Sequence, residues 1–241
     1  MAERQQMAEP VVGQAWPGWV PGKFQVHFIY TGVCESLFCI LPDGTSLLLD
    51  CGDHPACNRG ELAVPILPDQ SRHAGEWIAR YVERVNPSGR DVDYLMVSHF
   101  HSDHTGGETW HAGRTEGRGD DYYLSGFAQA AETLRFAVGI DRGWPDYDDP
   151  IPFSGHELTN MRKLYAWLRK TGDFRLEKFR VGESDQIAMR REPGRYGAFG
   201  IRNVCGNGRI ALAGGGIRDL YAGFRGERLN EAINRSWNRL L

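Results

Sequence analysis

Residues 98–107 read SHFHSDHTGG and place three histidines and an aspartate within six positions. The whole chain has eight histidines, so composition alone does not account for this grouping. Imidazole nitrogens together with a carboxylate suit zinc, iron or manganese. The sequence therefore predicts a metal site formed by His99, His101, Asp103 and His104.

The spacing within this motif divides its side chains into two pairs. His99 and His101 are two residues apart, and alternate side chains of an extended segment point the same way, so both imidazoles can converge on one cation. Asp103 and His104 follow where the chain leaves the strand, and they can turn toward a second position. The glycines that end the motif allow the backbone to pass close to the site without a Cβ.

The motif follows a buried strand in a strand–helix–strand pattern. Residues 91–99 (DVDYLMVSH) form a nearly continuous apolar run, typical of a strand covered on both faces. Residues 71–86 repeat apolar side chains at helical spacing and stop at an Asn-Pro pair. Three further strands are expected upstream, at 24–30, 36–41 and 46–53. Because open α/β sheets bind ligands at the carboxyl ends of their strands, this pattern favours a functional role for the motif.

The chain after the motif is expected to alternate between helices and strands. A Ser154-to-Glu157 capping-box spacing favours a helix start at His156. Asn207 and its flanking glycines predict a hairpin turn. The expected helices are 125–134, 156–172 and 227–241, and the expected strands are 134–140, 175–182, 196–204 and 209–214.

Composition limits the classes of partner. The net charge of -3 gives no electrostatic case for a nucleic-acid patch, and no apolar run is long enough to span a membrane. The five cysteines are an odd number without a Cys-x-x-Cys pair, and no export signal is visible, which predicts reduced thiols in a cytoplasmic protein. Residues 1–23 are expected to form an irregular tail before a domain at 24–241.

The motif and the strands before it resemble the metallo-β-lactamase superfamily. HFHSDHTGG matches the metal-binding signature of that family, and the segments VHFIYTG and SLFCILPDGTSLLLDCGD resemble its opening strands. The Pro-Asp-Gly turn, the Leu-Leu-Asp-Cys-Gly-Asp loop and the Asp-Tyr-Leu before the motif are most similar to the bacterial competence-type branch. The resemblance covers residues 24–110 and implies an α/β fold, the αββα sandwich, with a second half that is short or truncated.

The resemblance also implies a function. The family suggests a hydrolase that uses a metal-bound hydroxide, with one or two zinc ions, or iron or manganese in their place. His99 and His101 would hold one ion, and Asp103 and His104 the other, with Asp103 also orienting the hydroxide as the catalytic residue. Asp50 would anchor a metal-bound imidazole from behind. The substrate would be a small molecule or a phosphodiester.

The ligands that this family adds downstream are incomplete in the sequence. After the motif the only histidines are His111, which is expected to be solvated, and His156, which is either a ligand or the start of a helix. Asp219, after the strand at 209–214, is the candidate for a bridging carboxylate. This incompleteness keeps one alternative open, a truncated, inactive protein of this fold that acts in binding. An iron-dependent oxidoreductase is a further alternative that the resemblance implies, because the same fold also hosts iron enzymes. The oligomeric state is left open.

Overall fold

The central feature of the fold is a mixed sheet in which strands adjacent in space are also adjacent in sequence. The computed structural model describes residues 12–14, 16–54 and 64–237. The sheet order is β1-β2-β3-β4-β5-β6. Strands β1 to β3 pair antiparallel and β3 to β6 pair parallel, so the carboxyl ends of the last four share one edge. The strand bounds are β1 Gln25–Phe28, β2 Leu37–Ile40, β3 Ser46–Leu49, β4 Asp91–Met96, β5 Arg135–Asp141 and β6 Arg175–Lys178.

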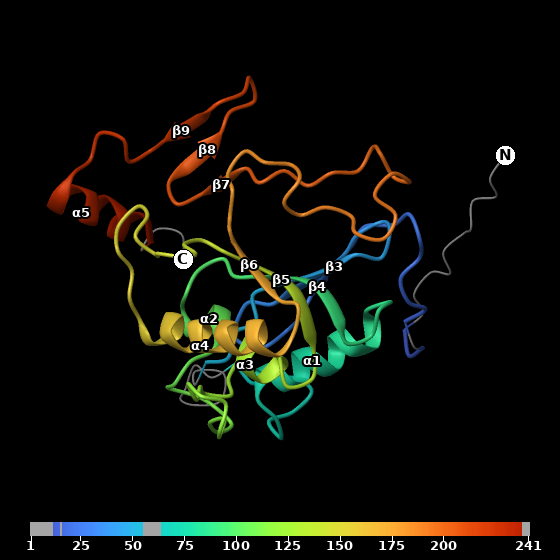
Figure 1. Cartoon of the computed structure of the whole chain (residues 1–241). Coiled ribbons are helices and arrows are strands. Elements are labelled where there is room, and N and C mark those ends of the chain that lie inside the picture. Colours follow the sequence, from blue (N-terminus) through green and yellow to red (C-terminus); the bar gives the residue numbers. More distant parts are fainter. Residues whose placement is uncertain (1–11, 15, 55–63, 238–241) are drawn as a thin grey trace.

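Three helices cover one face of this sheet (Figure 1). They are α1 (Ala74–Val85), α3 (Phe127–Ala130) and α4 (His156–Thr171). The apolar side of each helix packs on the sheet in one large cluster of buried residues. α1 ends at Asn86 because the next residue, Pro87, has no N–H with which to continue the helix. A further short helix, α2 (Ser102–Thr105), lies within the histidine motif.

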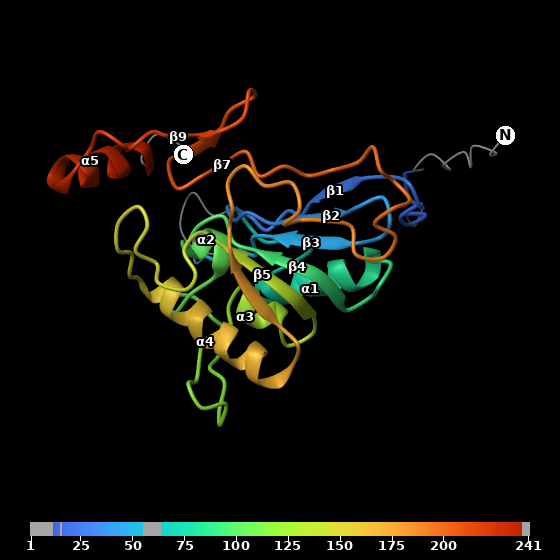
Figure 2. The same ribbon diagram turned by 45° about the horizontal axis from the view of Figure 1, so that its top comes forward.

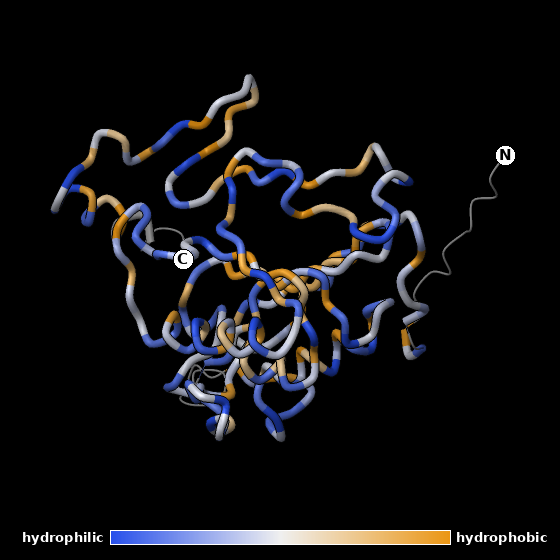
Figure 3. The backbone as a smooth tube through the Cα atoms, in the orientation of Figure 1, coloured by the Kyte–Doolittle hydropathy of each residue, from blue (hydrophilic) through white to orange (hydrophobic). Residues whose placement is uncertain are grey.

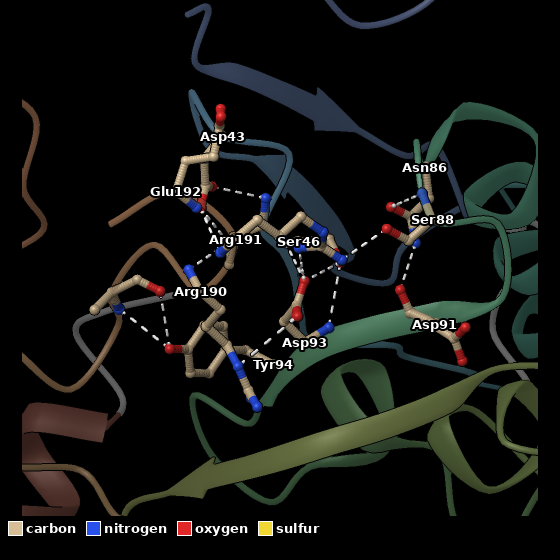
Figure 4. A network of polar contacts seen from close by, with 12 residues as sticks. Asp43, Ser46, Asn86, Ser88, Asp91, Asp93, Tyr94, Arg190, Arg191 and Glu192 are labelled. Atoms are coloured by element: carbon tan, nitrogen blue, oxygen red, sulfur yellow. Dashed lines mark hydrogen bonds and ion pairs between the residues drawn. The ribbon is translucent and has the colours of Figure 1, made fainter. Parts of the chain in front are cut away.

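The opposite face of the sheet carries a second, smaller apolar cluster, which includes Ile187 from the chain after β6. Hydrogen bonds hold this chain on the sheet: the N–H of Arg190 donates to Thr45, and those of Arg191 and Glu192 donate to Asp43 (Figure 4). Apolar residues are concentrated in the strands of the main sheet, between the helices on one face and the chain after β6 on the other (Figure 3). The sheet is therefore covered on both faces.

A second sheet of three short antiparallel strands lies on the side of the main sheet away from α1, α3 and α4 (Figures 1 and 2). Its strands are β7 (Cys205–Gly206), β8 (Arg209–Ala211) and β9 (Ile217–Asp219), followed by α5 (Gly226–Trp237). Asp149 links the two sheets. Its carboxylate accepts two hydrogen bonds from Arg209 at the start of β8, and one from Lys178 at the end of β6.

The predicted α/β class is confirmed, and so is the strand–helix–strand unit before the motif. The helix expected at 125–134 is shorter, because only α3 is regular and the following residues form hydrogen-bonded turns. The helix expected at 227–241 is α5, and its predicted continuation over 238–241 lies outside the described residues. Among the described residues 12–14 and 16–23 there is no helix or strand, and the rest of the expected tail is outside that range.

The strand expected at 196–204 is wrong. Two glycines, Gly197 and Gly200, weaken strand formation there. Asn203 exchanges backbone hydrogen bonds with Gly182 and Glu183 in a loop, so those groups are not available to a sheet. The hairpin around Asn207 is present, but its first strand is only β7.

The bridge at Asp149 predicts a specific pH dependence of stability. Hydrogen bonding to Arg209 lowers the pKa of Asp149 from 3.8 to about 2, against burial, and bonding to Lys178 adds to this effect. A lowered folded-state pKa contributes stability above the unfolded value, and that stability is lost as pH falls from about 4 toward 2. The Asp149→Asn variant should therefore be less stable than the wild type at neutral pH.

This difference in the free energy of unfolding, measured by urea titration, should shrink steadily below pH 4. All other carboxylates titrate in both proteins, so the comparison isolates Asp149. A difference that stays constant across this pH window would contradict the prediction.

Candidate metal centre

The histidine motif is attached to the loop that follows β3. The chain follows β4 through an irregular segment to His101, which is extended and precedes α2 as its N-cap. The N–H groups of Cys51 and Asp53 donate to the carbonyls of His104 and Ser102, at 2.8 and 2.9 Å. Two segments separated by about fifty residues in the sequence are thereby joined backbone to backbone.

Gly52 makes this approach possible. A Cβ at this position would overlap the backbone carbonyl of Asp103. On the other side of the motif, Gly106 has a positive φ of 73°, and a Cβ there would overlap the backbone of Ser125 and Gly126. The motif glycine thus allows close backbone packing, as expected, although the neighbour is the chain entering α3.

His99 and His101 point toward each other. His99 Nε2 and His101 Nδ1 are 3.2 Å apart, and the ring centroids are 4.7 Å apart. Two donors bound to one tetrahedral zinc ion, with bonds of 2.0–2.1 Å, are separated by about 3.3 Å. The separation of these two nitrogens is therefore that of two ligands of one ion.

Asp103 and His104 form a second pair. Asp103 Oδ2 lies 3.5 Å from His104 Nε2. On the opposite side of the imidazole, Nδ1 lies 2.8 Å from Asp50 Oδ2. A carboxylate can only accept, so Nδ1 carries the hydrogen and Nε2 presents its lone pair to Asp103 in the neutral ring. Two electron-rich atoms that face each other in this way are stabilised by a positive charge between them.

Asp50 is itself held in place. The N–H and hydroxyl of Ser98 donate to its two carboxylate oxygens at 2.8 and 2.6 Å. Its φ of 57° is one that Asp tolerates better than most residues, and this conformation turns the chain below the motif. The contact expected of a residue that anchors a metal-binding imidazole is therefore present at His104, while the role itself stays a prediction.

The imidazoles of His99 and His104 differ in electrostatic environment. Burial, followed by the charges of His104 and His101, lowers the pKa of His99 to about 4. The neutral ring, which is the form that binds a cation, is therefore the form of His99 at neutral pH. Burial also acts to lower the pKa of His104, but the hydrogen bond and charge of Asp50, together with the charges of Asp103 and Glu35, outweigh it and the net pKa is raised.

A surface depression of about 420 Å³ opens over the motif. It is lined by Val33, His54, His101, Ser102, Asp103 and Glu157. The ligand candidates His101 and Asp103 thus face a space that a small substrate could enter. His54, from the loop after β3, borders the same depression.

His156 lies beside the end of the motif, against Gly107. It is the first residue of α4, as the helix-start reading expects, and its Nδ1 is 3.3 Å from Glu157. The expected capping box is absent, because the helix is capped by Gly155 without a side-chain hydrogen bond. Glu157 lines the depression instead. Its position in the sequence indicates only a helix-capping residue and does not predict this location.

Asp219 lies elsewhere. It ends β9 in the second sheet, is exposed, and accepts a hydrogen bond from the N–H of Tyr221 at 2.7 Å. No contact within the described part of the chain joins it to the motif. Its role as a bridging ligand, like that of His156, stays a prediction.

Two other histidines are more buried than the sequence suggests. His111 packs its ring on Tyr123, and its Nδ1 is buried, so it is not the solvated residue that was expected. His73 lies 3.0 Å from the buried carboxylate of Asp53. The sequence gives no sign of this contact between His73 and Asp53, because the two residues belong to separate loops.

The side chains of the motif are of the types that bind metal ions, but they converge only in pairs. Within residues 12–14, 16–54 and 64–237, no group of three or more His, Cys, Asp or Glu side chains is arranged to hold an ion. The two pairs described above have the chemistry that zinc, iron or manganese requires. Cys51 is fully buried, and burial raises the pKa of its thiol, so it acts as a core residue. Cys57 lies outside the described residues.

The fold and the motif together define a class of protein: a mixed α/β domain with a histidine- and aspartate-rich loop at the carboxyl end of a parallel strand. Residues 36–116 match the family model described as the Metallo-beta-lactamase superfamily. This match runs from the start of β2 through the motif and into the loop after it. No helix among the described residues is long and apolar enough to cross a membrane.

The tight backbone approach at Gly52 predicts a large effect of one methyl group. Gly52→Ala should destabilise the protein by about 2–4 kcal/mol, since either the loop or the motif must move to relieve the overlap. Gly194→Ala is the matched control, because its Cβ would meet no atom within 4 Å. The free energy of unfolding of both variants is measured by chemical denaturation. Equal destabilisation by the two substitutions would contradict the packing argument.

The contact with Asp50 predicts the tautomer of His104. In metal-free protein at alkaline pH, where the ring is neutral, the hydrogen should sit on Nδ1 and be absent from Nε2. Long-range ¹H–¹⁵N NMR correlations distinguish the two nitrogens. In Asp50→Ala this preference should be lost, while His111 should keep its wild-type signals. An Nε2–H tautomer in the wild type would show that Asp50 does not orient this ring.

Proposed function

We propose that the protein is a metal-dependent hydrolase whose centre is formed by His99, His101, Asp103 and His104. The observation that carries the proposal is the pairing of donors: two nitrogens 3.2 Å apart in one pair, and a nitrogen and an oxygen 3.5 Å apart in the other. Both pairs belong to one loop, and that loop borders an open depression. The family match over residues 36–116 gives independent support.

Each residue has a distinct task in this proposal. A bound ion would lower the pKa of a coordinated water toward 7 and so supply a nucleophile at neutral pH. His99 and His101 would hold one ion, and His104 with Asp103 the other. Asp103 would also orient the attacking water, because its carboxylate borders the depression. Asp50 is the positioning residue that keeps His104 in the tautomer able to bind.

Zinc is the first choice of metal, in one or two ions, with iron or manganese as the alternatives that these ligands also suit. His156 lies nearest to the motif among the further candidates, and we propose it as a third ligand reached by rotation of its side chain. Asp219 is the weaker candidate, since no contact links it to the motif. The substrate class is a small molecule or phosphodiester, and a competence-type relationship is part of the same proposal.

We also propose that the protein resides in a reducing compartment such as the cytoplasm. Cys34, Cys39 and Cys51 are free thiols buried in the fold. Free buried cysteines are typical of proteins from such compartments.

The first test combines metal content with turnover. Elemental analysis of protein purified without added metal should give one or two ions per chain, and the His101→Ala/Asp103→Ala double variant should lose them. The wild type should hydrolyse a chromogenic phosphodiester or ester, and the double variant should not. Asp50→Ala should weaken metal binding by about 10–100-fold. His111→Ala is the matched control and should retain both metal and activity.

Other results would point to the alternatives. Protein that binds none of zinc, iron or manganese on reconstitution would contradict the proposal and favour an inactive binding protein, a reading that the absence of a three-donor group among the described residues supports. Iron retained together with oxygen consumption, and without hydrolysis, would replace the proposed hydrolase by an oxidoreductase of the same fold.

A further inference from the structure

A second cavity, of about 270 Å³, lies beside the motif at the carboxyl ends of the parallel strands. Its walls come from the end of β4, the residue after β5, the end of β6, and the β7–β8 hairpin. Open α/β sheets bind their ligands at this edge. The hairpin is secured there by a hydrogen bond from the Asn207 side chain to the carbonyl of Arg142, at 2.7 Å.

The charged groups of this cavity are of one sign. Arg142, Lys178 and Arg209 line it, and none of its lining residues is acidic. Asp149 lies behind two of these cations and balances one charge. Asp141 lies near Arg142, but its oxygens are taken by the N–H groups of the following turn and by a tyrosine hydroxyl. A third carboxylate, that of Asp219, pairs with Arg209 across β8 and β9 and acts on its charge, so the cavity lining is positively charged while the carboxylates that balance it lie outside the lining.

Much of the remaining cavity wall is apolar, beside the polar side chains of Ser98 and Asn207. Val97, Phe179, Val181 and Ile217 contribute to it. The guanidinium of Arg142 is half-buried, and it lies 5.5 Å from the ring centroid of Phe153. Cations beside apolar walls match a ligand that has an acidic group on an apolar body, because such a ligand satisfies both surfaces at once.

Ser98 connects this cavity to the motif. It lines the cavity, and its hydroxyl lies 3.1 Å from Nδ1 of His99. A molecule bound among the three cations would therefore reach toward the histidines without displacing them.

We propose that this cavity is an anion pocket, in which Arg142, Lys178 and Arg209 receive the oxyanion of a small organic acid or phosphate ester whose apolar part lies against Phe179 and Ile217. Binding of the anion requires no metal. The role of the pocket in choosing the substrate rests on the proposed hydrolase function, and it makes acidic substrates the preferred class.

Binding of phenyl phosphate to the full-length, chelator-treated protein, measured by calorimetry, tests the pocket directly. Neutral phenol should bind far more weakly than phenyl phosphate. Lys178→Met should weaken phenyl phosphate binding by at least about tenfold, since it removes a charge-assisted contact while Arg209 keeps its link to Asp149. Arg195→Met is the charge-matched control, because Arg195 is exposed and its contacts, an ion pair with Glu192 and stacking on Tyr196, involve no residue of the cavity.

A variant with the opposite expected sign guards against loss of folding. Asp149→Asn removes the carboxylate that competes with the ligand for Lys178 and Arg209, so it should tighten phenyl phosphate binding several-fold. General damage to the fold would weaken binding in both Lys178→Met and Asp149→Asn. Tightening in one and weakening in the other is expected only if these groups face the anion.

Three results would overturn the proposal: equal affinity in Lys178→Met and the wild type, weaker binding in Asp149→Asn, or equal binding of phenol and phenyl phosphate. Inorganic phosphate is a further probe, and if it binds as tightly as phenyl phosphate, the apolar walls have no role and the proposal fails in that part. Repeating the measurement in His101→Ala/Asp103→Ala separates the two proposals: the pocket should bind there unchanged, whether or not the wild type hydrolyses anything.

Discussion

The carboxylate of Asp50 fixes the geometry on which the rest of the site depends. It binds the backbone and hydroxyl of Ser98 on one side and the imidazole of His104 on the other. The next residues of the same loop bond to the carbonyls of α2, and Gly52 allows the two backbones to approach. One loop thus determines where the motif begins, which way it turns, and which nitrogen of His104 is presented.

The same sheet edge holds two chemically different regions. The motif supplies imidazole nitrogens and a carboxylate, which are ligands for cations, whereas the neighbouring cavity supplies three cations, which attract anions. Ser98 stands between them and contacts both. Because parallel strands deliver all their carboxyl ends to one edge, groups from the ends of β4, β5 and β6 gather there.

Local sequence patterns predict most of the helices and strands in the first half of the chain. The apolar run before the motif and the alternation upstream give β1 to β4 and α1 correctly, because these elements follow simple periodicities. The two-residue spacing of His99 and His101 also predicts their convergence. The regions that sequence reasoning missed depend on long-range contacts instead.

Glu157 appears in the sequence as a capping residue, and only the packing of α4 against Gly107 brings it to the depression. The three basic residues of the anion pocket are spread over nearly seventy positions, so no local signal could group them. The segment at 196–204 contains aromatic and apolar residues typical of a strand, but it also contains two glycines, and Asn203 uses its backbone hydrogen-bonding groups in a loop. In each case the partner, rather than the residue, decides the outcome.

The parallel pairing of β3 with β4 has a consequence for how the protein folds. Adjacent parallel strands cannot be joined by a tight turn, and here the crossover runs through α1. Asp50 and His104 can meet only after that crossover has closed, and loops of this length close at an entropic cost that slows folding. The residues proposed to hold metal are neighbours in the sequence, but they acquire the carboxylate that orients His104 only as a product of the sheet's assembly.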